Sequence, residues 1–450
     1  MEIEKTPLWR EALDIIENGD ILGIIGWSAI IHLGTPDSEI LIPLQVNALN
    51  LRRDYNLAYA DEFTCTLSMP LGKYARRVYP NRNTLQITLT KTYLKGTSKE
   101  IDYSKPVETE RYTATLIDER GGAVEGQGRE SNTEDALDLV DILDVNFQLY
   151  NKNIEQIRMM TVGAVFRSTN MHDVIKTVLS NEASKSKVDT KLKIQGVDII
   201  PVSNKEKHEQ VVITHGVKLT DVPNFLQNKY GVYNSGLGSY IQGNLWYVFP
   251  MYDTSQFEKR ENNVTILVLP TSKCPEIERS FKKKGASVTI LVSSDTNFKE
   301  DTANSYLNTG NGVRIGDANS FMENHSATKD NKTTIARKKT NSEFITDSRP
   351  DGCNNVLLPS NRITANPFTT YSDLVSRNGG VFKAIWNNSD ISLIIPGMMA
   401  KIVYFDQDKV CEIYGVVLAM KHTSLKVGDV KSQRHTTNSC IYVFVNRKIK

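Results

Sequence analysis

The chain of 450 residues is long enough for two to four domains with substantial cores. Its 54 basic and 52 acidic residues leave a net charge of +2, which argues against a protein held to nucleic acid mainly by electrostatic attraction. Charged residues make up 24% and apolar residues 40%, as in ordinary globular proteins, so wholesale disorder and a membrane protein are both disfavoured.

The N-terminal segment is mixed in charge and lacks the pattern of a signal peptide. Residues 21–33 are strongly apolar, but this run is shorter than the roughly 20 residues that cross a bilayer, and Gly23 and Gly26 interrupt it. We therefore expect a buried strand or a docking arm there, without stable membrane insertion. The cysteines are odd in number and show no CxxC spacing, which disfavours disulfides and zinc and favours a reducing compartment.

Residues 39–118 alternate between apolar and polar side chains, the period of half-buried antiparallel strands. The inward-facing sets are Phe63, Cys65, Leu67 and Met69, then Leu85, Ile87 and Leu89, and then Tyr112, Ala114 and Leu116. Turn-type sequences such as PNRN and ERGG separate these runs, so we predict one small barrel or sandwich.

Helical spacing begins after residue 131. Ser131 and Glu134 are placed like a capping box, and the apolar residues that follow predict a helix over 134–150. Those apolar residues are Ala136, Val140, Leu143 and Phe147. Residues 161–166 then predict a strand, and Thr169 or Asn170 caps a second helix, so an α+β unit is the simplest interpretation.

The segment 219–253 combines a capped helix, a glycine-rich turn and an aromatic strand. Pro223 follows polar capping residues, Gly231 ends the short helix, and residues 245–252 form the strand. We predict a helix, a turn and a hairpin that serve as scaffold.

The C-terminal third contains two strand-rich parts separated by a polar stretch. The sequences VTILVLP and VTILVSS predict two strands in 264–294, whereas 297–355 loses periodicity and is interpreted as a long loop or a segment ordered by a partner. Four further strands are predicted, at 391–395, 401–405, 411–420 and 440–445, and together they favour a second β-barrel.

No motif supplies a catalytic or metal site. GxxxxGK[ST] and GxGxxG sequences are absent, and His208 with His215 provides too few ligands for zinc. The aspartates at 135, 138, 141 and 144 are interpreted as a solvated helix face rather than a cation site. Lysines 282–284 and the tail Arg447, Lys448, Lys450 could contact phosphate, but solvated charge or a subunit salt bridge is favoured. We predict no catalytic, cofactor-binding or metal-binding residues.

Segments 46–91, 158–179, 219–253 and 394–422, taken in order, resemble the baseplate hub proteins of contractile phage tails, particularly those of large phages. The resemblance implies a β-rich α+β fold with two tail-tube-like antiparallel β-barrels, an α+β hub domain between them and a long polar loop region. The implied organisation is an arm at 1–35, a first barrel at 36–130, the hub domain at 131–262, a β segment at 263–296, a polar insertion at 297–365 and a second barrel at 366–450.

The resemblance further implies a non-enzymatic virion protein, assembled in the host cytoplasm. It would form a homotrimer whose pseudo-sixfold ring joins the trimeric central spike to the hexameric tail tube, with wedge proteins as further partners. DNA would pass through the ring lumen without specific binding. The candidate subunit interface contains Trp27, Trp246, Tyr247 and Phe249, because aromatic residues dominate interface energetics, although each also fits a plain core position.

Two other functions stay open at this point. One is a tail-associated hydrolase that degrades the cell wall, which would need two carboxylates facing each other across a cleft. The other is a nucleic-acid or host-ligand binding module that uses the polar stretch 297–355, for which salt-sensitive DNA affinity would be evidence.

Overall fold

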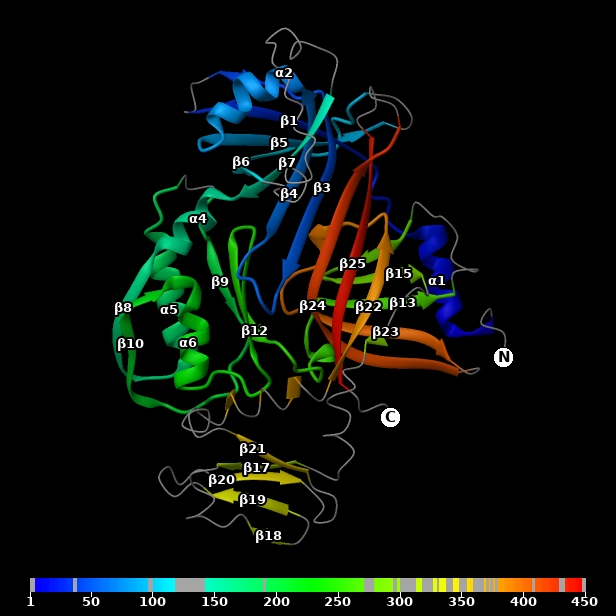
Figure 1. Ribbon diagram of the computed structural model, residues 1–450. Helices are drawn as coiled ribbons and strands as arrows, with labels where there is room; N and C mark the ends of the chain where they lie inside the picture. The colour runs from blue at the N-terminus through cyan, green and yellow to red at the C-terminus, as the bar shows by residue number, and fades with distance from the viewer. Residues whose placement is uncertain are drawn as a thin grey trace.

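The computed structural model describes most of the chain (Figure 1). The described residues are 5–34, 39–95, 100–117, 142–188, 192–270, 279–293, 379–406, 409–428 and 434–446, with short stretches between 298 and 376. A β-rich α+β fold is observed, and its largest element is one sheet of 15 strands. The sheet order is β14-β15-β13-β23-β24-β3-β4-β7-β6-β5-β1-β25-β22-β16, with β2 beside β1.

The strands of this sheet come from both ends of the chain. The N-terminal ones are β1 (Ile24–Leu33), β2 (Ile40–Leu41), β3 (Gln45–Asp54), β4 (Glu62–Pro70), β5 (Leu85–Leu94), β6 (Glu108–Leu116) and β7 (Ile142–Tyr150). The others are β13 (Asn263–Leu269), β14 (Phe281–Lys284), β15 (Ser287–Ser293), β16 (Phe298–Lys299), β22 (Gly379–Asn387), β23 (Met399–Asp406), β24 (Lys409–Lys426) and β25 (Arg434–Asn446). The long strands β24 and β25 therefore connect the two halves of the sheet (Figure 1).

Eight of these strands pair in a closed circuit. The path runs β24-β3-β4-β7-β6-β5-β1-β25 and returns to β24, with β1 and β25 joined at Ile25–His435 and Gly26–Arg434. Apolar side chains that alternate along the strands fill one end of the circuit, as the period-two pattern predicts. They include Ile31, Leu49, Leu67, Leu85, Ile87, Phe147 and Leu149. The helical turn at Leu71–Lys73 (α2) follows β4 at this end.

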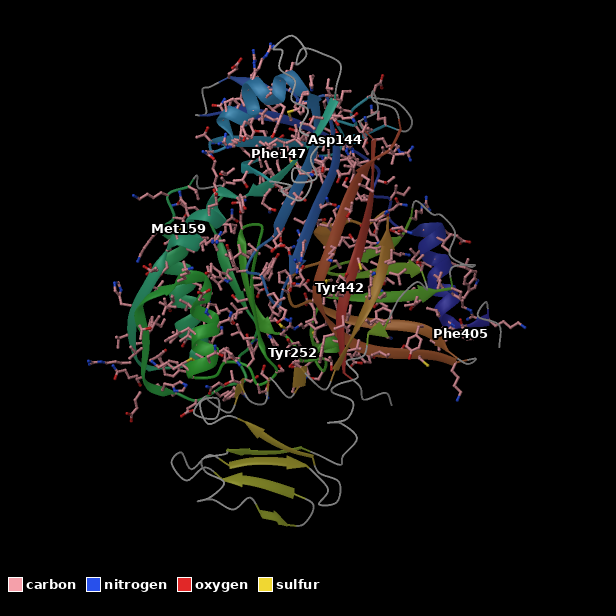
Figure 2. The ribbon with its side chains drawn as sticks, in the orientation of Figure 1. Asp144, Phe147, Met159, Tyr252, Phe405 and Tyr442 are labelled. Atoms are coloured by element: carbon pink, nitrogen blue, oxygen red, sulfur yellow. The ribbon has the colours of Figure 1, made fainter. Side chains whose placement is uncertain are left out.

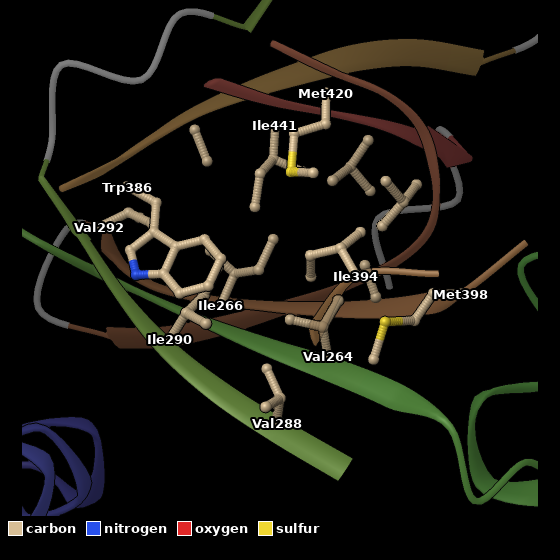
Figure 3. Packing of buried hydrophobic residues seen from close by; sticks show 14 of the residues in the cluster. Val264, Ile266, Val288, Ile290, Val292, Trp386, Ile394, Met398, Met420 and Ile441 are labelled. Atoms are coloured by element: carbon tan, nitrogen blue, oxygen red, sulfur yellow. The ribbon is translucent and has the colours of Figure 1, made fainter. Parts of the chain in front are cut away.

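The second half of the sheet curves around another apolar core (Figure 3). Trp386 of β22 packs with side chains of β13, β15, β24 and β25, and its indole Nε1 donates to Ser280 Oγ at 2.9 Å. The two predicted VTILV strands are confirmed, and they pair in parallel with identical residues opposite each other, Val264 beside Val288. Helix α1 (Pro7–Asn18) covers the outer face through Leu8, Ala12 and Ile15.

The α+β unit lies beside the strand circuit. It contains α4 (Lys152–Met159), β8 (Thr161–Thr169), α5 (Met171–Ser184), β9 (Gly196–Ile199), β10 (His208–Lys218), α6 (Val222–Lys229), β11 (Leu237–Gln242) and β12 (Leu245–Pro250). The predicted helix, turn and hairpin are confirmed, and Asn170 caps α5 by accepting a hydrogen bond from the Asp173 amide at 2.9 Å. Gly231 ends α6 at φ +80°, a backbone conformation that glycine adopts without steric cost.

The predicted helix over 134–150 is wrong in its second half. Residues 142–150 form β7, whereas 131–141, including the predicted capping box, lie outside the described residues. The sequence also fits a period of two, because Val145, Phe147 and Leu149 point into the circuit. Pairing with β4 and β6 on both sides therefore overrides the helical pattern.

The predicted strand at 391–395 is also wrong. Ile391–Leu393 form a 3₁₀ turn, and Asp390 Oδ1 caps it by accepting from the Ser392 amide at 3.0 Å. Within the predicted polar insertion, β17 (Val313–Asp317) pairs with β21 (Asn354–Leu358), and β18 (Ala327–Lys329), β19 (Lys332–Ala336) and β20 (Glu343–Asp347) form a small sheet. Apart from these strands and β16, which pairs with β22, the insertion lies outside the described residues.

The structure thus places strands of all six predicted segments in one sheet. The arm contributes β1, the first barrel β2 to β6, the hub domain β7, the β segment β13 to β15, the polar insertion β16 and the second barrel β22 to β25. Two separate tail-tube-like barrels and the predicted domain boundaries stay predictions.

Candidate functional site: a cavity where the strand circuit meets the α+β unit

A cavity of about 780 Å³ lies inside the strand circuit, where the circuit meets α4 and the β11–β12 hairpin. Its wall contains residues of all eight circuit strands and of the turn that follows Ser389. The aromatic lining residues are Trp27, Tyr59, Phe63, Tyr112 and Tyr150. A volume of this size lies within the range of sites for small organic molecules.

A buried ion pair holds the inner wall of the cavity. Arg53 is 7% exposed, and its guanidinium lies 3.2 Å from Asp61, while its Nη1 donates to the Ile391 carbonyl at 2.8 Å. Tyr240 donates to the same Asp61 carboxylate at 2.8 Å. This cluster joins β3, β11 and the 3₁₀ turn, so it fixes the α+β unit against the circuit.

Burial controls the ionisation of the tyrosines in this cluster. Desolvation raises the pKa of Tyr240 far above its ordinary value, and Asp61 raises it further because its charge disfavours a phenolate. Desolvation likewise raises the pKa of Tyr55, whose ring meets that of Tyr240 edge-on at 4.8 Å. Both phenols therefore stay neutral hydrogen-bond donors at physiological pH.

A second polar cluster lies on β24 and β25. His422 Nδ1 is 2.9 Å from Ser439 Oγ, which is 2.7 Å from Ser389 Oγ. Desolvation lowers the pKa of His422 to about 3, and the charges of Arg53 and Lys91 lower it further in the same direction. The imidazole is therefore neutral at physiological pH. Its Nδ1 contacts the Ser389 and Ser439 hydroxyls, and among the described residues these contacts include no carboxylate of the kind that orients a catalytic histidine.

The lining of the cavity contains more acidic than basic side chains. Its carboxylates are Asp61, Glu62, Glu108, Glu110, Glu155 and Asp390, and its cationic residues are Arg53, Lys91 and Arg158. Lys91 pairs with Glu108 at 3.4 Å, and Glu110 accepts from the Tyr112 hydroxyl at 2.6 Å. The excess of six carboxylates over three cations gives the cavity a negative field.

The four predicted interface aromatics occupy different environments. Trp246 and Phe249 are buried in the chain's own cores, whereas Trp27 and Tyr247 are half-buried. Trp27 lines the cavity and packs against both β cores. The structure therefore does not bring the four together on one surface, and a role for any of them at a subunit interface stays a prediction.

Sequence reasoning missed the Arg53 cluster, although the period of two contains the signal. Leu49, Leu51 and Arg53 alternate on β3 and all face inward, so an arginine at the third position is a buried charge that needs a partner. The partner could not be found from the sequence, because Asp61 acquires its contacts only through the pairing of β3 with β4 and through the hydrogen bond from Tyr240 of β11.

The sequence patterns that suggested cation or phosphate contact have local partners where they are described. Asp144 lies on β7 near Phe147 (Figure 2) and accepts from Asn47 Nδ2 at 2.7 Å. Lys282 pairs with Asp14 at 2.6 Å. His215 is exposed, and among the described residues no group of three His, Cys, Asp or Glu side chains could hold a metal ion. The tail Arg447, Lys448 and Lys450 lies outside the described residues.

Apolar side chains are exposed at the end of the circuit opposite the cavity. We define the apolar rim as Ile42, Leu44, Ile142 and Val427, whose exposed fractions range from 40% to 66%. Leu44 and Ile142 both lie beside the end of β4, because the Leu44 amide donates to the Ser68 carbonyl and Ile142 pairs with Pro70. None of the helices among the described residues is long and apolar enough to cross a membrane.

A protein-family model described as Bacteriophage PBS1 gene 109 protein matches residues 77–341. This match covers more than half of the chain. A comparison with curated proteins gives no match.

Three solved structures are similar to the chain at low sequence identity. A tail protein from Neisseria meningitidis MC58 shares 9% identity at a TM-score of 0.45, covering 94% of this chain and 98% of that one. The 43 kDa tail protein of prophage MuSo2 from Shewanella oneidensis shares 8% sequence identity at a TM-score of 0.48, and the match covers 92% of this chain and 96% of that one. The Francisella PdpA–VgrG complex contains a chain that shares 10% sequence identity at a TM-score of 0.37, and the match covers 98% of this chain and 61% of that one.

Proposed function

Because the chain belongs to the Bacteriophage PBS1 gene 109 protein family, we propose that it is a structural protein of the virion, the baseplate hub of a contractile tail. In this role three copies form a ring with pseudo-sixfold symmetry. The ring joins the trimeric spike to the hexameric tail tube, and its lumen continues the DNA channel.

The closed circuit of eight paired strands is the observation that carries this proposal. A sheet closed on itself has no free edge, so a ring subunit built on it can withstand assembly at high local concentration without uncontrolled strand pairing. Strand β14, in contrast, lies at the end of the large sheet and has an outer edge. The Asp20 amide donates to the Phe281 carbonyl on that edge at 2.8 Å. Both features fit a rigid component of an assembly.

The apolar rim supports self-association in the proposed ring. Ile42 is 66% exposed and Ile142 is 57% exposed on adjacent parts of one surface, and such grouped apolar side chains are typical of contact surfaces. We propose that the rim contributes to the contact between copies, together with the half-buried Tyr247. The tail tube, spike and wedge proteins remain the proposed partners.

Light scattering after size exclusion, over a concentration series, tests the proposal. A trimer has a mass of about 152 kDa, three times the 50.6 kDa of the chain, formed alone or on addition of the spike protein. Ile42→Asp should shift the equilibrium toward monomer, whereas Leu57→Asp, at an 81% exposed site away from the rim, should not. A chain that stays monomeric with every tail protein offered would contradict the hub proposal.

A further inference from the structure

The chemistry of the cavity wall indicates what kind of molecule it can hold. Apolar side chains such as Ile25, Leu51 and Ile154 form much of the wall, and five aromatic rings add flat surfaces. Phe63 and Tyr112 meet edge-on with ring centres 5.4 Å apart, so part of a ring face stays directed away from this contact. A ligand with an apolar body therefore matches the wall.

The charged side chains of the lining select the other end of the ligand. Arg53 is held by Asp61 and Lys91 by Glu108, so two of the three cations are already engaged by carboxylates of the same cavity. Among the described residues, the donors to Glu110 are neutral, the Tyr112 hydroxyl at 2.6 Å and Asn151 Nδ2 at 3.1 Å. Glu155 likewise accepts from the Thr113 hydroxyl at 2.9 Å. Neither carboxylate has a cationic partner among these contacts, so both are available to a cation that enters the cavity.

We propose that this cavity binds an amphipathic organic cation, a molecule with an ammonium group and an apolar body. The ammonium lies at Glu110 and Glu155, near the Tyr112 and Tyr150 rings, where carboxylates and aromatic faces attract it together. The apolar body extends along the apolar part of the lining, toward Trp27 and Leu51. This site is independent of the proposed hub function, because it lies within one chain.

A buried hydroxyl behind the wall provides a way to close the cavity. Ser424 lines the cavity from β24, is 1% exposed, and its Oγ has no hydrogen-bond partner among the described residues. A larger apolar side chain at this position fills the space that the ligand body would occupy and leaves no hydroxyl to satisfy. Its neighbour Thr423 faces the other side of the strand and provides a matched control.

Titration calorimetry on the full chain tests the proposal with three probes of equal chain length. Octyltrimethylammonium is the cation, octyl glucoside the neutral probe and octanoate the anion, each below its critical micelle concentration. We expect saturable binding of one cation per chain, affinity about tenfold weaker for octyl glucoside and no detectable binding of octanoate. Raising the salt concentration should weaken cation binding.

Two variants locate the binding in the cavity. Glu110→Gln keeps the hydrogen-bond acceptor but removes the charge, so the cation should bind about three- to fivefold more weakly while octyl glucoside is unaffected. Glu258→Gln, an exposed carboxylate elsewhere, should change neither. Ser424→Leu should abolish binding of both probes and Thr423→Leu should not.

Three results would overturn the proposal. They are the absence of saturable cation binding to the wild-type chain, octanoate binding as tightly as the cation, and wild-type affinity in both Glu110→Gln and Ser424→Leu. Because Glu110 is exposed, its variant is expected to fold, so the charge test stands even if Ser424→Leu does not give folded protein.

Discussion

Replacing Arg53 by methionine tests the junction between the strand circuit and the α+β unit. The change removes the ion pair with Asp61 at 3.2 Å and the hydrogen bond to the Ile391 carbonyl at 2.8 Å, while an unbranched apolar chain fills most of the volume. Loss of one partner from a buried pair typically costs about 3–5 kcal/mol. The Asp61 side chain keeps 29% exposure and the Tyr240 hydrogen bond, so we expect the lower end, about 3 kcal/mol.

The neighbouring arginine provides the control for this prediction. Arg52 also lies on β3 and also pairs with carboxylates, Asp54 at 3.0 Å and Glu62 at 3.5 Å, but its side chain is 49% exposed. Solvent screens such a pair, so Arg52→Met should cost less than about 1 kcal/mol.

Urea unfolding followed by circular dichroism, with limited proteolysis of the native protein, measures both arginine variants. We expect the Arg53 variant to lose stability and to gain cleavage near the β11–β12 hairpin, because the cluster fixes this hairpin to the circuit. In the double variant Arg53→Met/Asp61→Leu the loss should be smaller than the sum of the two single losses, because the two groups interact directly. Equal stability of the two arginine variants, or strict additivity in the double variant, would refute this reasoning.

Two further predictions follow from the buried groups. The pKa of His422 is about 3 in the folded chain, below its ordinary value of 6.5. Between these pH values the unfolded chain binds more protons, so acidification favours unfolding. The free energy of unfolding falls by at most about 1.4 kcal/mol per pH unit. His422→Gln should flatten the fall in melting temperature from pH 6.5 to 4, and His215→Gln, at an exposed site, should leave the slope unchanged. A Cβ added to Gly238 would lie 2.2 Å from the ring of Phe249, so Gly238→Ala should lower the stability measured by thermal unfolding by about 1–3 kcal/mol. A Cβ added to Gly196 would lie 3.4 Å from the Leu245 side chain, an ordinary contact distance, so Gly196→Ala should be nearly neutral.

Periodic patterns predicted individual strands well, because each depends on alternation within one short segment. The structure contains the predicted elements of this kind: the inward-facing apolar residues of β4 and β5, the two VTILV strands, and the helix before the aromatic hairpin. The second half of the predicted helix over 134–150 failed because Val145, Phe147 and Leu149 fit a strand as well as a helix, and the neighbouring strands decide between them.

The arrangement of strands could not be predicted from local pattern. The pairings of β24 with β3 and of β25 with β1 join segments more than 300 residues apart, and nothing in either segment specifies the partner. The cavity depends on these pairings, since its wall combines Trp27, Phe63 and His422 from opposite ends of the chain. The predicted interface therefore shares only Trp27 with the cavity, and two of its other residues, Trp246 and Phe249, are buried in cores.

Electron cryomicroscopy of purified virions that carry a small peptide tag on this chain is the most direct test of the proposed function. We expect three tagged copies in one ring at the end of the tail tube, with the strand circuits around the DNA channel. A virion that lacks the chain, or carries it outside the tail axis, would contradict the hub proposal.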